Sequence, residues 1–141
     1  MTKTSDMPPQ KLRELVFLLL FSQDSHASDP DDLFETVSRE LKVGQKQVEY
    51  AWERVESILK LLPEIDAQIS TVSTSFDFHR IQKVELAVLR LSCYELVFEK
   101  KLSASIIIAE AKRMAKKFAT PDAASFCQAL IDAMVKSKNL S

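Results

Sequence analysis

Apolar residues recur every three to four positions along almost the whole chain, which is the spacing of one face of an α-helix. No segment shows the sustained alternation of apolar and polar residues that is typical of a half-buried strand. The pattern predicts about seven helices, over approximately residues 10–23, 30–41, 45–62, 64–73, 80–99, 105–118 and 121–136. The predicted fold class is therefore all-α, with short loops between the helices.

Proline, glycine and capping residues indicate where several of these helices begin. The runs Asp29-Pro30-Asp31-Asp32 and Thr120-Pro121-Asp122 each supply a cap, a proline for the first helical position and acid in the first turn. Gly44 indicates a turn before the third helix, and Pro63 ends that helix and starts the fourth. The β-branched run Ile106 to Ile108 has no partner strand, so we assign it to the sixth helix.

The segment 80–99 is the most apolar of the predicted helices. A helix that is apolar around most of its circumference is normally the central helix of its domain. Arg90 and Glu95 lie within it, and an unpaired charge in such a position would be costly. We therefore expect both side chains to reach the rim of the core or to form structural pairs.

Size and composition indicate one globular domain. With 141 residues, of which 46% are hydrophobic, the chain can bury one compact core. We predict a flexible tail over residues 1–9 and a single domain over residues 10–141. The first ten residues are polar, and the apolar run from Leu15 to Phe21 is too short to span a bilayer. We therefore expect a soluble, cytoplasmic protein without a membrane partner.

Several classes of function are disfavoured by composition. The formal net charge of −1 excludes a globally basic nucleic-acid binder but not a local basic face. Gly44 is the only glycine, which excludes Gly-rich phosphate loops. His26 and His79 have no second ligand at metal spacing. Cys93 and Cys127 have no nearby histidine in the sequence and resemble small buried hydrophobes in a reducing compartment. We predict no catalytic residue, metal or cofactor, and hence no enzyme.

The second half of the chain carries a series of ordered motifs. Phe76 and Arg80 stand where a large apolar residue precedes an arginine. The following blocks are, in order, Val84-Glu85-Leu86-Ala87-Val88-Leu89-Arg90 with Tyr94-Glu95-Leu96, then Ile108-Ala109-Glu110-Ala111, Ala115-Lys116-Lys117-Phe118, and Ser125-Phe126 with Leu130-Ile131-Asp132. In the first half, Ile65-Asp66 with Ile69 matches a recurrent I-D-x-x-I. In these motifs, from about Lys11 to Lys136, the chain resembles the NusB family of transcription antitermination factors.

The resemblance implies a fold, a function and partners. The fold would be two small helical bundles packed crosswise. The function would be binding the boxA element of nascent ribosomal RNA as a single strand, together with the small ribosomal-subunit protein that acts as NusE, and delivering both to the RNA polymerase antitermination complex. Glu85 would be exposed on the face that meets the ribosomal protein.

The resemblance also suggests which residues bind RNA. Cations hold the phosphates of single-stranded RNA, and its bases stack on aromatic rings. Lys3, Lys11 and Arg13 would contact phosphates, Phe21 and Phe126 would stack on bases, and Asp122 would accept hydrogen bonds from base edges. The alternative for both phenylalanines is a place in the core.

A second basic cluster is visible without the family. Its members, spaced to share one side of the sixth helix, are Lys112, Arg113, Lys116 and Lys117. These cations are candidates for further phosphate contacts. The alternative is a solvated face partly balanced by Glu110.

Departures from the family pattern leave a second function open. Pro9 and Gln10 stand where basic residues are usual, and Ala109, Ala119 and the run Cys127-Gln128-Ala129 replace asparagines and glycines of the motifs. A helical protein-interaction module with the NusB fold and weak or no RNA binding is the alternative. A detached copy of the NusB-like domain of an RNA cytosine methyltransferase is a third, weaker one. The pattern leaves both a monomer and a homodimer open.

Overall fold

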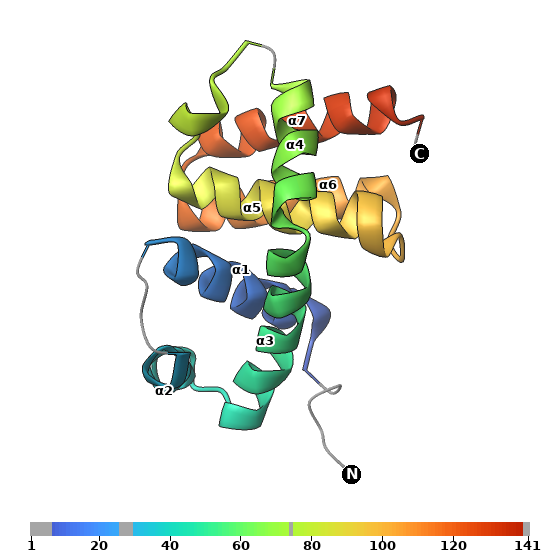
Figure 1. Cartoon of the computed structure of the whole chain (residues 1–141). Helices are drawn as coiled ribbons and strands as arrows, with labels where there is room; N and C mark the ends of the chain where they lie inside the picture. Colours follow the sequence, from blue (N-terminus) through green and yellow to red (C-terminus); the bar gives the residue numbers. More distant parts are fainter. Residues whose placement is uncertain (1–6, 26–29, 74, 140–141) are drawn as a thin grey trace. The chain divides into compact units, whose positions relative to one another are not determined.

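The computed structural model describes residues 7–25, 30–73 and 75–139, and in these ranges the chain is helical throughout, without a strand (Figure 1). The predicted all-α class is confirmed. The chain divides into two compact units, Met1–Leu59 and Lys60–Ser141, which we describe separately. The flexible tail predicted for residues 1–9 lies mostly outside the described ranges, and the single domain over residues 10–141 stays a prediction.

Unit 1 is built from α1 (Pro9–Ser25), α2 (Pro30–Leu41) and α3 (Gln45–Lys60), whose last residue belongs to unit 2. α1 packs on α2. The buried residues of α3 follow the spacing of one helical face and are Val48, Ala51, Val55 and Ile58.

Unit 2 contains α4 (Leu62–Val72), the 3₁₀ turn η2 (Phe78–Arg80), α5 (Lys83–Cys93), the π-helical segment η3 (Tyr94–Glu99), α6 (Ala104–Phe118) and α7 (Pro121–Ser137). α5 packs against α4, α6 and α7, and α6 pairs closely with α7. α5 and α7 run in the same direction. α6, which lies between them in the sequence, runs in the opposite direction (Figure 1). The starts of α5 and α7 therefore lie at one end of this unit, and their far ends at the other.

The central position of the fifth helix is confirmed, but its predicted limits were wrong. Every residue from Leu86 to Leu89 is buried, so the helix is covered on all sides. Its α-helical part starts at Lys83, because residues 78–80 form the separate turn η2, and its last six residues form η3. Lys100 then ends the segment with a left-handed backbone (φ 59°).

The charged residues of the central helix are accommodated within the protein. Arg90 donates two hydrogen bonds to the Asp66 carboxylate, from Nε to Oδ1 and from Nη2 to Oδ2, both 2.9 Å. This bidentate pair joins α5 to α4 and confirms a structural pair for Arg90. Glu95 is buried as well, and in the described residues every buried side-chain nitrogen and oxygen has a hydrogen-bond partner.

The capping signals are confirmed where they can be observed. The Thr120 hydroxyl accepts a hydrogen bond of 3.0 Å from the backbone N–H of Ala123 and so caps α7, with Pro121 in the first turn. Ser103 caps α6 in the same way. α4 starts at Leu62 with Pro63 in its first turn. Asp29, the predicted cap of α2, lies outside the described residues.

Formal charge differs in sign between the two units. Unit 1 contains seven Lys and Arg against eleven Asp and Glu, and unit 2 contains twelve against nine, so the formal charges are −4 and +3. The net charge of −1 thus hides an excess of cations in unit 2. None of the helices described in Figure 1 has the length and apolar character needed to cross a membrane.

Candidate nucleic-acid interface

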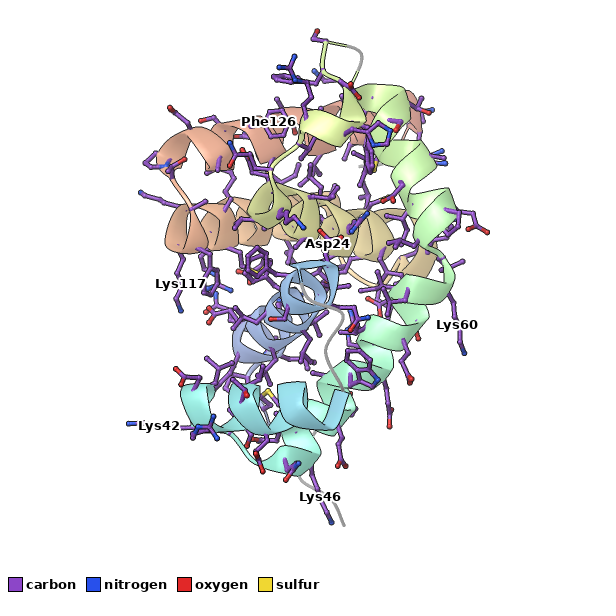
Figure 2. The ribbon with its side chains drawn as sticks, turned by 60° about the vertical axis from the view of Figure 1, so that its left-hand side comes forward. Asp24, Lys42, Lys46, Lys60, Lys117 and Phe126 are labelled. Atoms are coloured by element: carbon purple, nitrogen blue, oxygen red, sulfur yellow. The ribbon has the colours of Figure 1, made fainter. Side chains whose placement is uncertain are left out.

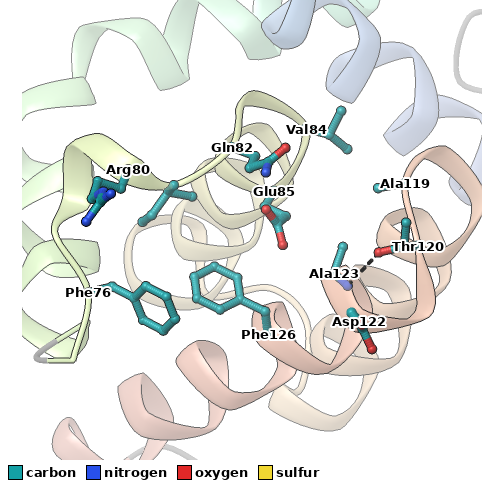
Figure 3. A pocket seen from close by; sticks show the side chains of 11 residues that line it. Phe76, Arg80, Gln82, Val84, Glu85, Ala119, Thr120, Asp122, Ala123 and Phe126 are labelled. Carbon is teal, nitrogen blue, oxygen red and sulfur yellow. Dashed lines mark hydrogen bonds between the residues drawn. The ribbon is translucent and has the colours of Figure 1, made fainter.

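A cavity of about 470 Å³ lies in unit 2 where α5 and α7 begin (Figure 3). One wall comes from the segment that leads into α5, and the other from the turn between α6 and α7 and the first turns of α7. The lining residues are Phe76, Arg80, Ile81, Gln82, Val84, Glu85, Ala119, Thr120, Asp122, Ala123 and Phe126. Two segments about 40 positions apart in sequence therefore form one site.

An aromatic pair forms one side of this cavity. The rings of Phe76 and Phe126 meet edge to face, with centroids 4.9 Å apart and planes at 81°. Phe76 is 53% exposed, and Phe126 is half-buried. Phe126 is therefore not fully buried in the core, which was the alternative considered from the sequence. It lies at the edge of the core, where a planar group from solvent can reach it.

Two helix N-termini converge on the cavity. Gln82 is the residue at the N-cap position of α5, Thr120 caps α7 with its hydroxyl, and both residues line the site. The first-turn N–H groups of a helix carry partial positive charge and favour anions nearby. Each helix also places an acidic residue in its first turn, Glu85 in α5 and Asp122 in α7.

Glu85 is half-buried, which corrects the expectation that it would be exposed. Because it stands three residues after the cap of α5, its carboxylate reaches back to the Gln82 backbone N–H. Burial raises the pKa of Glu85 above its ordinary value, and the hydrogen bond to Gln82 offsets part of this increase. The hydrogen bond in the first turn of α5 thus holds the Glu85 side chain at the cavity wall.

Asp122 is exposed, and in Figure 3 its carboxylate points away from Phe126. Arg80 is exposed at the opposite wall, beside Phe76. Neither Phe76 nor Arg80 was among the predicted site residues, although both stood in the motif of a large apolar residue before an arginine. That motif was the signal from which they could have been found.

The predicted basic cluster on α6 is only partly a set of exposed cations. Lys112, Lys116 and Lys117 are exposed. Arg113 instead forms an ion pair with Glu110 at 3.0 Å, so Glu110 balances one of the four charges, as the alternative expected. Lys117 projects outward near the end of α6 and lies 5.4 Å from the centre of the Phe118 ring (Figure 2).

The remaining predicted site residues lie in the N-terminal part of the chain. Lys11 is exposed and Arg13 is half-buried on α1. Phe21 is half-buried, with its ring stacked on that of Phe17 at a centroid distance of 6.2 Å. Lys3 lies outside the described residues. The predicted RNA-binding residues therefore divide between units 1 and 2, and Asp122 and Phe126 line the cavity of unit 2.

The two cysteines are buried and free. Burial raises the pKa of each thiol to about 12, so neither is ionised near neutral pH. The Cys127 thiol instead donates to the Glu85 backbone carbonyl at 3.9 Å, a contact between α7 and α5 beneath the cavity. Both cysteines are small core residues, as predicted.

Ala119, which replaces a family glycine, does not adopt the left-handed conformation that favours glycine. It ends α6 with φ −138°. In residues 7–25, 30–73 and 75–139, no group of three or more His, Cys, Asp or Glu is placed to hold a metal ion.

The helical fold, the aromatic cavity and the exposed lysines define the class, a small all-helical protein with a candidate surface for an anionic, base-bearing ligand. The chain belongs to the NusB family, whose model matches residues 10–136. It is similar to the transcription antitermination protein NusB of Chlamydia pneumoniae, at 31% identity over 98% of this chain and 86% of that protein. It is also similar to the NusB protein of Geobacter sulfurreducens, at 33% identity over 85% and 88%.

Solved structures agree with this assignment. A crystal structure of the antitermination factors NusB and NusE in complex with double-stranded RNA matches with a TM-score of 0.77 and 26% identity, over 97% of this chain and 99% of that chain. NusB of T. maritima matches with a TM-score of 0.77 and 30% identity, over 92% of both chains. The resemblance seen in the sequence motifs is confirmed.

Proposed function

We propose that this protein is a transcription antitermination factor that binds boxA-type single-stranded RNA of ribosomal RNA transcripts jointly with a NusE-type ribosomal protein. It would act as an adaptor that presents both to the elongating RNA polymerase, in the cytoplasm and without making or breaking a covalent bond. The observation that carries the proposal is the cavity of unit 2, where Phe126 and Phe76 offer aromatic faces between two helix N-termini. A structural relative is a complex of NusB and NusE with double-stranded RNA, which supports RNA and a NusE-type protein as the two ligands.

In this proposal the RNA is held by stacking and by phosphate contacts. A base would stack on Phe126, and Asp122 would accept hydrogen bonds from base edges. Cations would follow the phosphates, and the candidates are Lys3, Lys11 and Arg13 from the start of the chain and Lys112, Arg113, Lys116 and Lys117 from α6. The positive formal charge of unit 2 favours the α6 lysines as the larger contribution.

The partner protein would bind at the Glu85 face. Glu85 lies at the wall of the same cavity, so protein and RNA would meet close to one another. Two weak surfaces acting on one RNA give a complex that binds more tightly than either protein alone.

Binding of a boxA-type RNA and of a scrambled RNA, with and without the NusE-type protein, tests the proposal. Measurements at two salt concentrations separate phosphate contacts from base contacts, because only the former depend steeply on salt. We expect the boxA-type RNA to bind more tightly than the scrambled RNA, and the difference to grow when the partner is added. Equal, weak binding of both RNAs in the presence of the partner would rule the proposal out.

The second candidate function is a helical protein-interaction module of NusB fold that has lost RNA binding. The specific observation in its favour is the first helix, where Pro9 and Gln10 occupy positions usually held by basic residues. This candidate predicts binding of the ribosomal protein with no effect of added RNA on its affinity.

A further inference from the structure

A second cavity, of about 380 Å³, lies at the opposite end of unit 2 from the aromatic site. It is lined by Val97 and Lys100, at the end of η3, and by Ser137 and Lys138, at the end of α7. Since α5 with η3 and α7 run in the same direction, their last turns meet at this end (Figure 1). None of the motifs that indicated the family includes these residues.

The lining of this cavity is cationic and has no acidic residue. Both lysines are exposed, and among the described residues neither takes part in an ion pair. Lys101 and Lys136 stand next to them in sequence and are exposed too. Glu99, the nearest acid in sequence, is half-buried and has an interaction partner of its own. Four lysines outweigh Glu99 and the partial negative charges of the two helix C-termini at this end, so the potential at the cavity is positive.

A lysine ammonium is a compact point charge with three donors and is a common ligand of phosphate in proteins. The Ser137 hydroxyl already donates to the Met134 carbonyl at 3.1 Å, which leaves its oxygen able to accept but not to donate. The two ammonium groups are therefore the donors available to an anion, and a phosphodiester, whose single negative charge is shared by two non-bridging oxygens, suits a pair of such donors.

We propose that Lys100 and Lys138 form a phosphate-binding site for the RNA backbone, at the end of unit 2 away from Phe126. The inference rests on the proposed RNA-binding function and extends the RNA path along α7. Lys138 lies 16 positions after Asp122, so the two ends of this path are about 24 Å apart along the helix. At a stacked spacing of 3.4 Å per phosphate this distance corresponds to roughly seven nucleotides.

Lys100→Gly tests this site without disturbing the backbone conformation. Lys100 has φ 59°, a conformation that glycine adopts more easily than lysine, so the substitution removes the charge without straining the backbone. Lys42→Gly is its matched control, because Lys42 has φ 57° and is also exposed, but lies in unit 1 (Figure 2). Lys138→Ala removes the second cation.

The experiment measures the affinity of the full chain, with the NusE-type partner, for a boxA-type RNA of 14 nucleotides over a range of salt concentrations. Each lost phosphate contact lowers the slope of log K against log salt by about 0.7 for a single strand. Because the two lysines hold one phosphate, we expect a decrease of about 0.7 for Lys100→Gly with Lys138→Ala and no change for Lys42→Gly. An unchanged slope in the double variant would overturn the proposal.

A titration with inorganic phosphate, followed by the NMR shifts of the Lys100, Ser137 and Lys138 amides, separates the two sources of the anion. Phosphate-induced shifts combined with an unchanged RNA slope would indicate a site for free phosphate and overturn the assignment to RNA. Failure of the proposed function gives a different result from failure of this site. BoxA-type and scrambled RNA would then bind with equal affinity, while the lysine substitutions would still lower the salt slope. A wild-type chain that binds no RNA would overturn both.

Discussion

Phe126 shows how one residue can serve both packing and recognition. Its ring is half-buried against the start of α5 and edge-on to Phe76, yet it remains part of an open cavity wall. A half-buried ring that packs on another ring has less side-chain entropy to lose when a base stacks on it than a fully exposed ring has.

The contribution of this ring can be measured with Phe126→Leu. Stacking of a base on an aromatic side chain contributes about 1–3 kcal/mol, so we expect RNA affinity to fall about 5- to 150-fold. Phe98→Leu is the matched control, because Phe98 is also half-buried but belongs to η3. Equal losses in the two variants, or a loss explained by a lower melting temperature, would argue against stacking on Phe126.

Glu85 is expected to make stability depend on pH. Burial raises its pKa in the folded protein above the value of 4.5 for the unfolded chain, so the folded state binds more protons in the range between the two values. Stability then decreases as pH rises from 4.5 through the folded pKa. Glu85→Gln removes this dependence. The melting temperature of the variant minus that of the wild type should therefore increase from pH 4 to pH 7.

The control for the pH effect is Asp122→Asn, which changes the exposed acid of the neighbouring helix. Both acids line the same cavity, so a change of the pH profile that appears in Glu85→Gln but not in Asp122→Asn identifies Glu85 as its source. Parallel profiles for Glu85→Gln and the wild type would contradict the role given to burial.

At the scale of elements, the central helix α5 is held by packing on all sides and by one ion pair. The pair between Arg90 and Asp66 connects it to α4, and the side chains are only 12% and 25% exposed. Exposed ion pairs contribute about 0–1 kcal/mol, but removing one partner of a bidentate, largely buried pair costs more because the other charge is left buried and unpaired.

A double-mutant cycle with Asp66→Asn and Arg90→Gln measures this connection. We expect each single variant to lower the free energy of unfolding by about 1.5–3 kcal/mol. The double variant should lose less than the sum of the two, with a coupling energy above about 1 kcal/mol. Strictly additive losses in denaturant unfolding would show that the two side chains do not stabilise each other.

At the scale of the whole molecule, charge separates the two units. Unit 1 is acidic and unit 2 is basic in formal charge, so the attraction between this protein and an RNA backbone should arise mainly from unit 2. The exposed lysines of α6, which are Lys112, Lys116 and Lys117, are the main candidates.

Replacing these three lysines of α6 with alanine tests that distribution. We expect the salt slope of RNA binding to fall by about two, since each lysine accounts for about 0.7. The control removes three exposed lysines from elsewhere, Lys42, Lys46 and Lys60 (Figure 2), and should leave the slope unchanged. The pair Lys11→Ala with Arg13→Ala should have a smaller effect than the α6 triple variant. A larger effect on the slope from Lys11→Ala with Arg13→Ala than from the α6 triple variant would place the phosphate contacts on α1.

Much of the fold was predictable because helical periodicity and capping are local properties. The apolar positions, Pro63 and the Thr120 cap indicated the helices with errors of a few residues. The exception is the segment 78–99, whose composition does not distinguish a 3₁₀ turn, an α-helix and a π-helical segment. Those differences depend on packing around α5, which a local pattern does not contain.

The sequence by itself determined the helical class, the family motifs, the burial of Cys93 and Cys127 and the excess of cations in the second half. Tertiary structure alone decided that Phe76 pairs with Phe126, that Glu85 turns into a cavity wall and that Lys100 and Lys138 line one cavity. The physical reason is distance along the chain. Periodicity reports which face of a helix is buried, whereas a site is formed by residues tens of positions apart whose proximity depends on how whole helices pack.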